Sequence, residues 1–136
     1  MKVLIDTNVI LDVLCKRAGF YEASAKIMKL CETHILDGAI SALSVPNILY
    51  ILRKELDAEK SREIVEKLQL IFSVEDLKAE DIKKALATDF GDFEDALQSA
   101  CAVRIKAQYI VTRNVRDFEN SKVSAIEPSE LLRQLG

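Results

Sequence analysis

Short runs of consecutive apolar residues alternate along the chain with longer segments in which apolar residues recur every three or four positions. The short runs are typical of strands covered on both faces, and they occur at 3–5, 70–74, 109–112 and 122–126, with a further β-like segment at 34–41. The longer segments predict amphipathic helices at 8–16, 21–32, 45–56, 58–70, 79–87, 92–106 and 128–135. Strands and helices in this order predict a three-layer α/β/α sandwich with a central parallel sheet.

The composition agrees with this α/β class and narrows the remaining choices. The chain has 136 residues, of which 49% are hydrophobic and 30% charged, which is enough apolar material for a buried core and excludes intrinsic disorder. Only four Gly and two Pro are present, which disfavours an all-β fold with many tight turns. No shift in composition divides the chain, so we expect one domain over residues 1–136.

The cysteines and the apolar segments bear on compartment. Cys15, Cys31 and Cys101 form no C-x-x-C motif, and His34 is the only histidine, so a zinc site is not expected. We expect free thiols that serve as small buried hydrophobic residues in a reducing cytosol. No stretch approaches the roughly 20 apolar residues of a membrane span. The sequence therefore predicts a cytoplasmic protein with no membrane partner.

Acidic residues follow the predicted strands. Asp6 directly ends the first strand, and Asp117 follows the strand at 109–112 at a distance of five residues, with Asn114 between them. Asp92 and Asp95 are three residues apart and share one face of a helix. In a parallel sheet, ligands bind beyond the carboxyl ends of the strands, where these acids are expected to meet.

Each acid also has an ordinary structural explanation. Asp92 is placed to cap a helix N-terminus, Asp95 to interact with the helix dipole, and Asp117 to form a turn. Asp6 is harder to explain in this way, because a carboxylate at the end of a buried strand needs a partner or a cation. Clustered carboxylates without His or Cys point to Mg²⁺ or Mn²⁺ and to hydrolysis of a phosphate ester or phosphodiester.

Other phosphate-handling motifs do not fit the chain. Asp6-Thr7-Asn8 lacks the second acid of a D-x-D phosphatase motif, and no apolar strand in mid-chain ends on an Asp, as a response-regulator receiver requires. Glycine-rich nucleotide-binding loops are also absent. A phosphatase acting on a small phosphoester remains a weaker alternative.

The ordered motifs resemble a known family. The opening Val3-Leu4-Ile5-Asp6-Thr7-Asn8, the later Asp92-Phe93-Glu94-Asp95-Ala96, and Ile110-Val111-Thr112-Arg113-Asn114 followed by Asp117-Phe118 are similar to those of PIN domains, which include VapC-type toxins of toxin–antitoxin pairs. The resemblance covers essentially the whole chain. It implies a metal-dependent endoribonuclease in which acidic residues surround Mg²⁺ or Mn²⁺.

The resemblance also implies roles for individual residues. Asp6, Asp92, Asp95 and Asp117 would be the catalytic and metal-binding acids, with Asn114 as the alternative to Asp117 in the fourth position. Thr112 would orient a ligand or water, and Thr7 and Asn8 would position Asp6. Arg113 and Arg116, which stand beside the acids, are candidates for contacts with the RNA backbone.

One position departs from the family pattern. Family members usually carry a Glu early in the helix after the second strand, where this chain has Asn47. An amide oxygen can still contact a metal or a water, but it supplies no charge and no base. Glu94 is a possible substitute, although its direction on the helix differs by about 100° per residue from those of its acidic neighbours.

The net charge of −3 hides an uneven distribution. Residues 75–95 hold eight acids and three lysines, whereas residues 104–122 hold five bases and two acids. A bound cation would neutralise part of the acidic segment, and the basic segment is suited to a phosphate backbone. The overall charge therefore does not exclude a nucleic-acid substrate.

Two hypotheses from different classes follow. The first is a toxin-like ribonuclease whose partners are an RNA substrate, a cognate antitoxin and a second copy of the chain in a possible homodimer. The second, motivated by Asn47, is a PIN-like module that binds RNA or protein without cutting. Ile48, Leu49, Ile51 and Leu52 are candidates for an interface, and core packing explains them equally well.

Overall fold

The computed structural model describes residues 1–136, and its five strands form one parallel sheet. The strands are β1 (Lys2–Ile5), β2 (Asp37–Ser41), β3 (Ser73–Glu75), β4 (Tyr109–Val111) and β5 (Ser124–Ile126). The helices are α1 (Thr7–Leu14), α2 (Tyr21–Glu32), α3 (Ser44–Ile51), α4 (Ala58–Ile71), α5 (Ala79–Leu86), α6 (Phe93–Arg104) and α7 (Pro128–Leu135), with a 3-10 helix η1 (Val115–Phe118). The strand order is β3-β2-β1-β4-β5, and every pairing is parallel, which confirms the predicted fold class.

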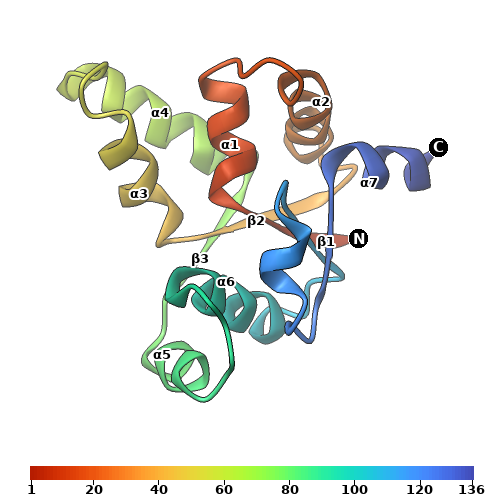
Figure 1. Ribbon diagram of the computed structural model, residues 1–136. Coiled ribbons are helices and arrows are strands. Elements are labelled where there is room, and N and C mark those ends of the chain that lie inside the picture. Colours follow the sequence, from red (N-terminus) through yellow and green to blue (C-terminus); the bar gives the residue numbers. More distant parts are fainter.

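Two layers of helices cover the sheet (Figure 1). Helices α1–α4 and α7 lie on one face, and α5, α6 and η1 lie on the other. Successive side chains of β1 point to opposite faces of the sheet and pack in both layers. Val3 and Ile5 belong to the larger apolar cluster, and Leu4 belongs to the smaller one. Each of the three side chains has no exposed surface, as expected for a central strand.

The central position of β1 decides where the functional groups lie. Ile5 is in register with Val111 of β4, and Leu4 is in register with both Ala39 of β2 and Ile110 of β4. The chain leaves β1 for β2 on one side and reaches β4 on the other, so the strand order reverses at β1. A parallel sheet opens a crevice beside such a reversal, at the carboxyl ends of the strands.

The described elements differ from the predicted ones mainly at their ends. The helix expected at 45–56 ends at Ile51, where the Arg53 side chain donates a 2.7 Å hydrogen bond to the Tyr50 carbonyl and satisfies one of the last carbonyls. Leu70 and Ile71 were predicted to begin a strand, but they complete α4. The edge strand β3 starts only at Ser73. The sequence pattern did not predict this boundary, because a short apolar run fits a helix as well as a strand.

The cysteines and apolar segments mostly follow expectation. All three cysteines are free, and burial raises the pKa of the Cys31 thiol to about 12 and that of Cys101 to about 11. Cys15 is exposed, so the prediction that it is buried was wrong. It follows the end of α1, beyond the part of the helix that faces the core. None of the helices has the length and apolar character that a membrane crossing requires.

A buried ion pair holds α6 against α5. Arg104 donates two 3.1 Å hydrogen bonds to the carboxylate of Asp81, which has no exposed surface. The same carboxylate accepts a hydrogen bond of 3.1 Å from the backbone N–H of Lys78 at the start of α5. The bidentate contact fixes the position of α6, and α6 carries the next acids of the site.

Gly38 allows β2 to pack closely under α2. A Cβ atom at this position would lie 2.5 Å from Cys31 Sγ and 2.9 Å from Cys31 Cβ. We predict that Gly38→Ala lowers the free energy of unfolding by about 1–3 kcal/mol through overpacking, as measured by urea denaturation. Gly91→Ala is the matched control, since a Cβ there meets no atom within 4 Å. Equal stability of the two variants would contradict the packing argument.

Candidate active site

Asp6 occupies the centre of the candidate site. Its backbone N–H donates a 2.9 Å hydrogen bond to the Val111 carbonyl, which extends the pairing of β1 with β4 by one residue. Its side chain is 6% exposed, and its Oδ2 accepts a 2.9 Å hydrogen bond from the hydroxyl of Thr112, which is fully buried. Burial raises the pKa of Asp6 to about 6, and the nearby charges of Glu94 and Asp117 add to this effect. The predicted contribution of Thr112 therefore takes the form of a direct bond to Asp6.

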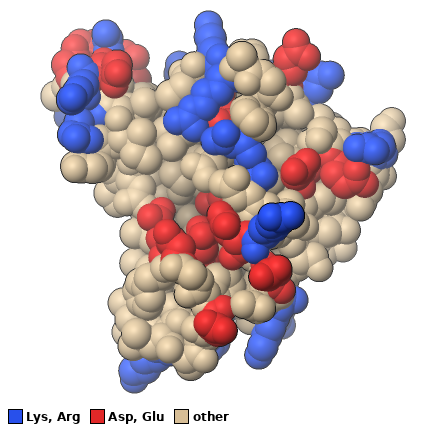
Figure 2. Space-filling view, viewed as in Figure 1, with Lys and Arg blue, Asp and Glu red and all other residues tan.

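Asp95 faces Asp6 from the first turn of α6. Its carboxyl is half-buried, and burial together with the surrounding negative charges raises its pKa to about 7. Those charges belong to Asp92, Asp6, Asp117 and Glu94. Figure 2 shows acidic side chains gathered near the middle of one face, with basic side chains at the edge of the group. We call these five residues, Asp6, Asp92, Glu94, Asp95 and Asp117, the acid cluster.

Asp92 has a structural task as well as its place in the cluster. It is the N-cap of α6, and its Oδ1 accepts a 3.1 Å hydrogen bond from the Asp95 backbone N–H. Its side chain is exposed. The capping explanation considered for this residue is therefore realised, and its negative charge still acts on Asp95.

Asn47 and Glu94 meet across the mouth of the site. Asn47 Nδ2 in the first turns of α3 donates a 2.7 Å hydrogen bond to Glu94 Oε1 on α6. The residue that departs from the family pattern thus contacts the acid that the sequence offered as its substitute. Neither α3 nor α6 alone specifies this contact, because it depends on the relative rotation of two helices from opposite layers.

Thr7 joins a buried polar network behind Asp6. Its hydroxyl lies 2.8 Å from that of Ser44 in α3, and Gln98 Nε2 in α6 donates to Ser44 Oγ at 3.1 Å. The three side chains link α1, α3 and α6 in a region where each is 6% exposed or less. Sequence reasoning did not identify Ser44 or Gln98, because an isolated Ser or Gln in a helix carries no pattern. The Asn8 side chain forms no hydrogen bond with Asp6.

The loop after β4 carries the remaining predicted residues. The Asn114 backbone N–H donates to Thr112 Oγ1 at 3.0 Å, so one hydroxyl connects Asp6 to the turn that begins η1. Asp117 is exposed on η1, and its charge raises the pKa of both Asp6 and Asp95. Of Asn114 and Asp117, the two alternatives for the fourth position, only Asp117 adds negative charge to the cluster. Arg116 is exposed on η1 as well.

Arg113 is held on the far side of the same loop. Its Nε lies 3.2 Å from Oδ2 of the buried Asp12, and its guanidinium carbon lies 4.3 Å from the Phe20 ring centroid. The sequence analysis assigned no role to Asp12. A single Asp on an otherwise apolar helix face was the available signal for a buried ion pair.

The donor set fits a divalent cation of the Mg²⁺ or Mn²⁺ type. No three acidic, His or Cys side chains converge at metal-ligand distances in this structure. The chemistry is nevertheless suitable: every side chain of the cluster offers carboxylate oxygens, and burial and mutual repulsion raise the pKa of two of them. A bound cation would remove this repulsion.

The fold and the site define a class of protein: an α/β protein with a parallel sheet and a group of acidic residues at the carboxyl edge of that sheet. The family model of the PIN domain matches residues 2–116, so the chain belongs to the PIN domain family. A search of curated proteins finds no significant match.

Several solved structures share the fold at low sequence identity. VapBC2 from Rickettsia felis, bound to a promoter DNA fragment, has a TM-score of 0.71 and 16% identity over 93% of this chain and 98% of that chain. A toxin–antitoxin complex from Klebsiella pneumoniae has a TM-score of 0.70 and 17% identity over 93% and 97%. DNA-bound VapBC from Salmonella typhimurium has a TM-score of 0.68 and 20% identity over 94% and 98%.

The raised pKa of Asp95 makes its carboxylate a source of instability in the metal-free protein. Because the folded pKa of about 7 exceeds the ordinary value of 3.8, this destabilisation grows as pH rises from about 4 to 7 and is constant above that. We predict that Asp95→Asn raises the free energy of unfolding at pH 8 by about 1 kcal/mol, after allowance for solvent screening and the lost helix-dipole interaction.

Urea denaturation with a chelator present measures this effect. The difference between Asp95→Asn and the parent should shrink when the pH is lowered from 8 to 5. Asp37→Asn, an exposed Asp at the opposite end of β2, should show no such dependence. A variant less stable than the parent at pH 8 would contradict the proposed repulsion.

Proposed function

We propose that this chain is a metal-dependent endoribonuclease that acts as the toxin of a toxin–antitoxin pair. The observation that carries the proposal is the acid cluster at the carboxyl edge of a PIN-domain sheet, with Asp6 and Asp95 at its centre. Mg²⁺ or Mn²⁺ is the proposed cofactor. When bound, such an ion lowers the pKa of a water molecule and stabilises negative charge on a phosphodiester.

The side chains have distinct tasks in this proposal. Asp6 and Asp95 bind the metal, with Asp117 and Glu94 completing the charge and Asp92 adding to it from the helix cap. Thr112 orients Asp6 through its 2.9 Å hydrogen bond, and Asn114 supports Thr112 through its backbone. Thr7, the residue after Asp6, is anchored to Ser44 by a hydrogen bond between their hydroxyls. Arg116 is the proposed contact with the RNA backbone, whereas the predicted contact of Arg113 requires that it leave Asp12.

The proposed partners are an RNA substrate and an antitoxin protein. One solved structure that shares this fold is described as a toxin–antitoxin complex and two others as VapBC, which supports an antitoxin for this chain. A homodimer is proposed as well. Of the four predicted interface residues, Ile48 is fully buried in the core, Leu49 and Leu52 are half-buried, and Ile51 is 48% exposed beside the exposed Tyr50. The end of α3 is therefore the part of that set available to a second chain.

Substitution of Asp6 tests the proposed activity. We predict that Asp6→Asn reduces Mn²⁺-dependent cleavage of RNA by more than the roughly 10–100-fold that loss of a supporting residue causes. The measurement is the rate of endonucleolytic cleavage of a mixed RNA substrate with and without chelator. Asp37→Asn is the matched control, because it makes the same change at the opposite edge of the sheet. Cleavage by Asp6→Asn at the parent rate would overturn the assignment.

Substitutions at the contact between Asn47 and Glu94 test whether the chain is an enzyme or a module that binds without cutting. If Glu94 supplies the charge missing at position 47, Glu94→Gln should weaken Mn²⁺ binding about 10-fold or more in calorimetry. The exchange Asn47→Glu with Glu94→Gln should restore most of the affinity, because it moves the charge across a 2.7 Å hydrogen bond. A parent protein that takes up no Mn²⁺ at millimolar concentration would favour the non-cutting module.

A further inference from the structure

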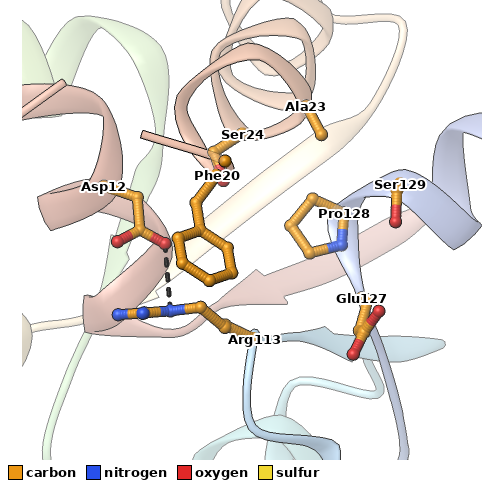
Figure 3. A pocket seen from close by; sticks show the side chains of 9 residues that line it. Asp12, Phe20, Ala23, Ser24, Arg113, Glu127, Pro128 and Ser129 are labelled. Carbon is orange, nitrogen blue, oxygen red and sulfur yellow. Dashed lines mark ion pairs between the residues drawn. The ribbon is translucent and has the colours of Figure 1, made fainter. Parts of the chain in front are cut away.

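Asp12 is a buried carboxylate with a cation on each oxygen. It lies on α1 with 1% of its side chain exposed. Arg17 Nη1 donates a hydrogen bond of 3.2 Å to Oδ1, and Arg113 Nε lies 3.2 Å from Oδ2 (Figure 3). The contact with Arg113 is an ion pair without hydrogen-bond geometry, since neither Oδ2 nor Nε has a hydrogen-bond partner. The contact between these two side chains is therefore one of charge attraction.

An aromatic ring covers one side of the Arg113 guanidinium. The ring is that of Phe20, with 4.3 Å between the guanidinium carbon and the ring centroid. Figure 3 shows the guanidinium directed toward Asp12, at one wall of a pocket of about 210 Å³ that Pro128 lines from the start of α7. A guanidinium stacked on a ring and paired with a carboxylate has a defined place in the structure.

Arg113 is also next in the chain to a residue that touches the acid cluster. The Thr112 hydroxyl donates a hydrogen bond to Asp6, so Arg113 directly follows a residue that contacts the central acid. The carboxylates of the cluster repel one another and lack a cation from the protein. A free guanidinium beside them would be attracted to them and would compete with a metal ion for the same oxygens.

Two acidic partners therefore compete for one arginine. Asp12 is the better partner in this structure because its carboxylate is buried, and a buried charge that loses its partner is strongly unfavourable. The cluster carboxylates are more open to solvent, with three of the five exposed. This difference in burial favours the arrangement in which Arg113 stays on Asp12.

We propose that Asp12 is a positioning residue that retains Arg113 and so keeps the acid cluster free for a divalent cation. The inference rests on the proposed function, because it concerns the metal site of that function. Asp12 does not touch the metal or the substrate. It acts by giving Arg113, which follows Thr112 in the chain, a partner outside the cluster.

Three substitutions test the proposal through Mn²⁺ affinity, measured by calorimetry. Asp12→Asn should weaken Mn²⁺ binding by about 10-fold or more, because Arg113 then moves onto the cluster. Arg113→Gln alone should bind Mn²⁺ within about 3-fold of the parent, and the double variant Asp12→Asn with Arg113→Gln should recover the affinity. The control is Asp12→Asn with Arg17→Gln, which removes the other cation and should give no recovery.

The pattern of recovery distinguishes positioning from plain structural support. Retained affinity in Asp12→Asn, an equal loss in Arg113→Gln, or recovery by Arg17→Gln would each overturn the proposal. If Asp12→Asn does not melt cooperatively, Phe20→Ala replaces it, since Phe20 is 41% exposed and its ring holds the guanidinium from one side only. Phe20→Ala should weaken Mn²⁺ binding several-fold in a manner that Arg113→Gln reverses, and unchanged binding would overturn the proposal.

A metal-free crystal structure provides a readout independent of the proposed function. In Asp12→Asn, the Arg113 guanidinium should lie within ion-pair distance of a carboxylate of the acid cluster. A guanidinium that stays over the Phe20 ring would overturn the proposal. If the parent binds no Mn²⁺, the proposed function fails, and this structure still decides where Arg113 goes when Asp12 loses its charge.

Discussion

The architecture of the site depends on one hydrogen bond between the two central strands. The Thr112 hydroxyl at the end of β4 donates to the Asp6 carboxylate at the end of β1, at 2.9 Å and with almost no exposure of either residue. This bond keeps a carboxylate at a position where burial alone opposes its charge. Because the same hydroxyl accepts from the Asn114 backbone, it also sets the path of the loop that brings Asp117 and Arg113 near the sheet edge.

The arginines that pair with buried acids lie outside the acid cluster, whose carboxylates repel one another. The cluster draws acids from β1, the start of α6 and η1, and its members raise one another's pKa values. Asp81 on α5, a buried acid outside the cluster, is paired with Arg104. Asp12 pairs in the same way with Arg17 and Arg113. These three arginines thus pair with buried acids outside the cluster, and the acids at the crevice form no ion pair.

The fold and the centre of the site could be predicted from the sequence because both follow from local patterns. Apolar runs and helical spacing determine which segments enter the sheet, and Asp6 directly follows three fully buried residues of β1. The contacts between layers could not be predicted in the same way. The bond from Asn47 to Glu94 and the network of Ser44 with Gln98 depend on how α3 and α6 are rotated toward each other. The end of α3 depends on a side-chain cap, and the start of β3 depends on its pairing at the edge of the sheet. Short apolar runs encode neither of these.

The strand order has a consequence for synthesis on the ribosome. Asp6 emerges first, but its hydrogen-bond partner lies 106 residues later in the chain, and η1 follows it. A nascent chain that has not yet released β4 cannot insert that strand beside β1, because the hydroxyl and the last acid are still in the exit tunnel. Assembly of the crevice therefore has to wait until β4 and η1 have been synthesised and released.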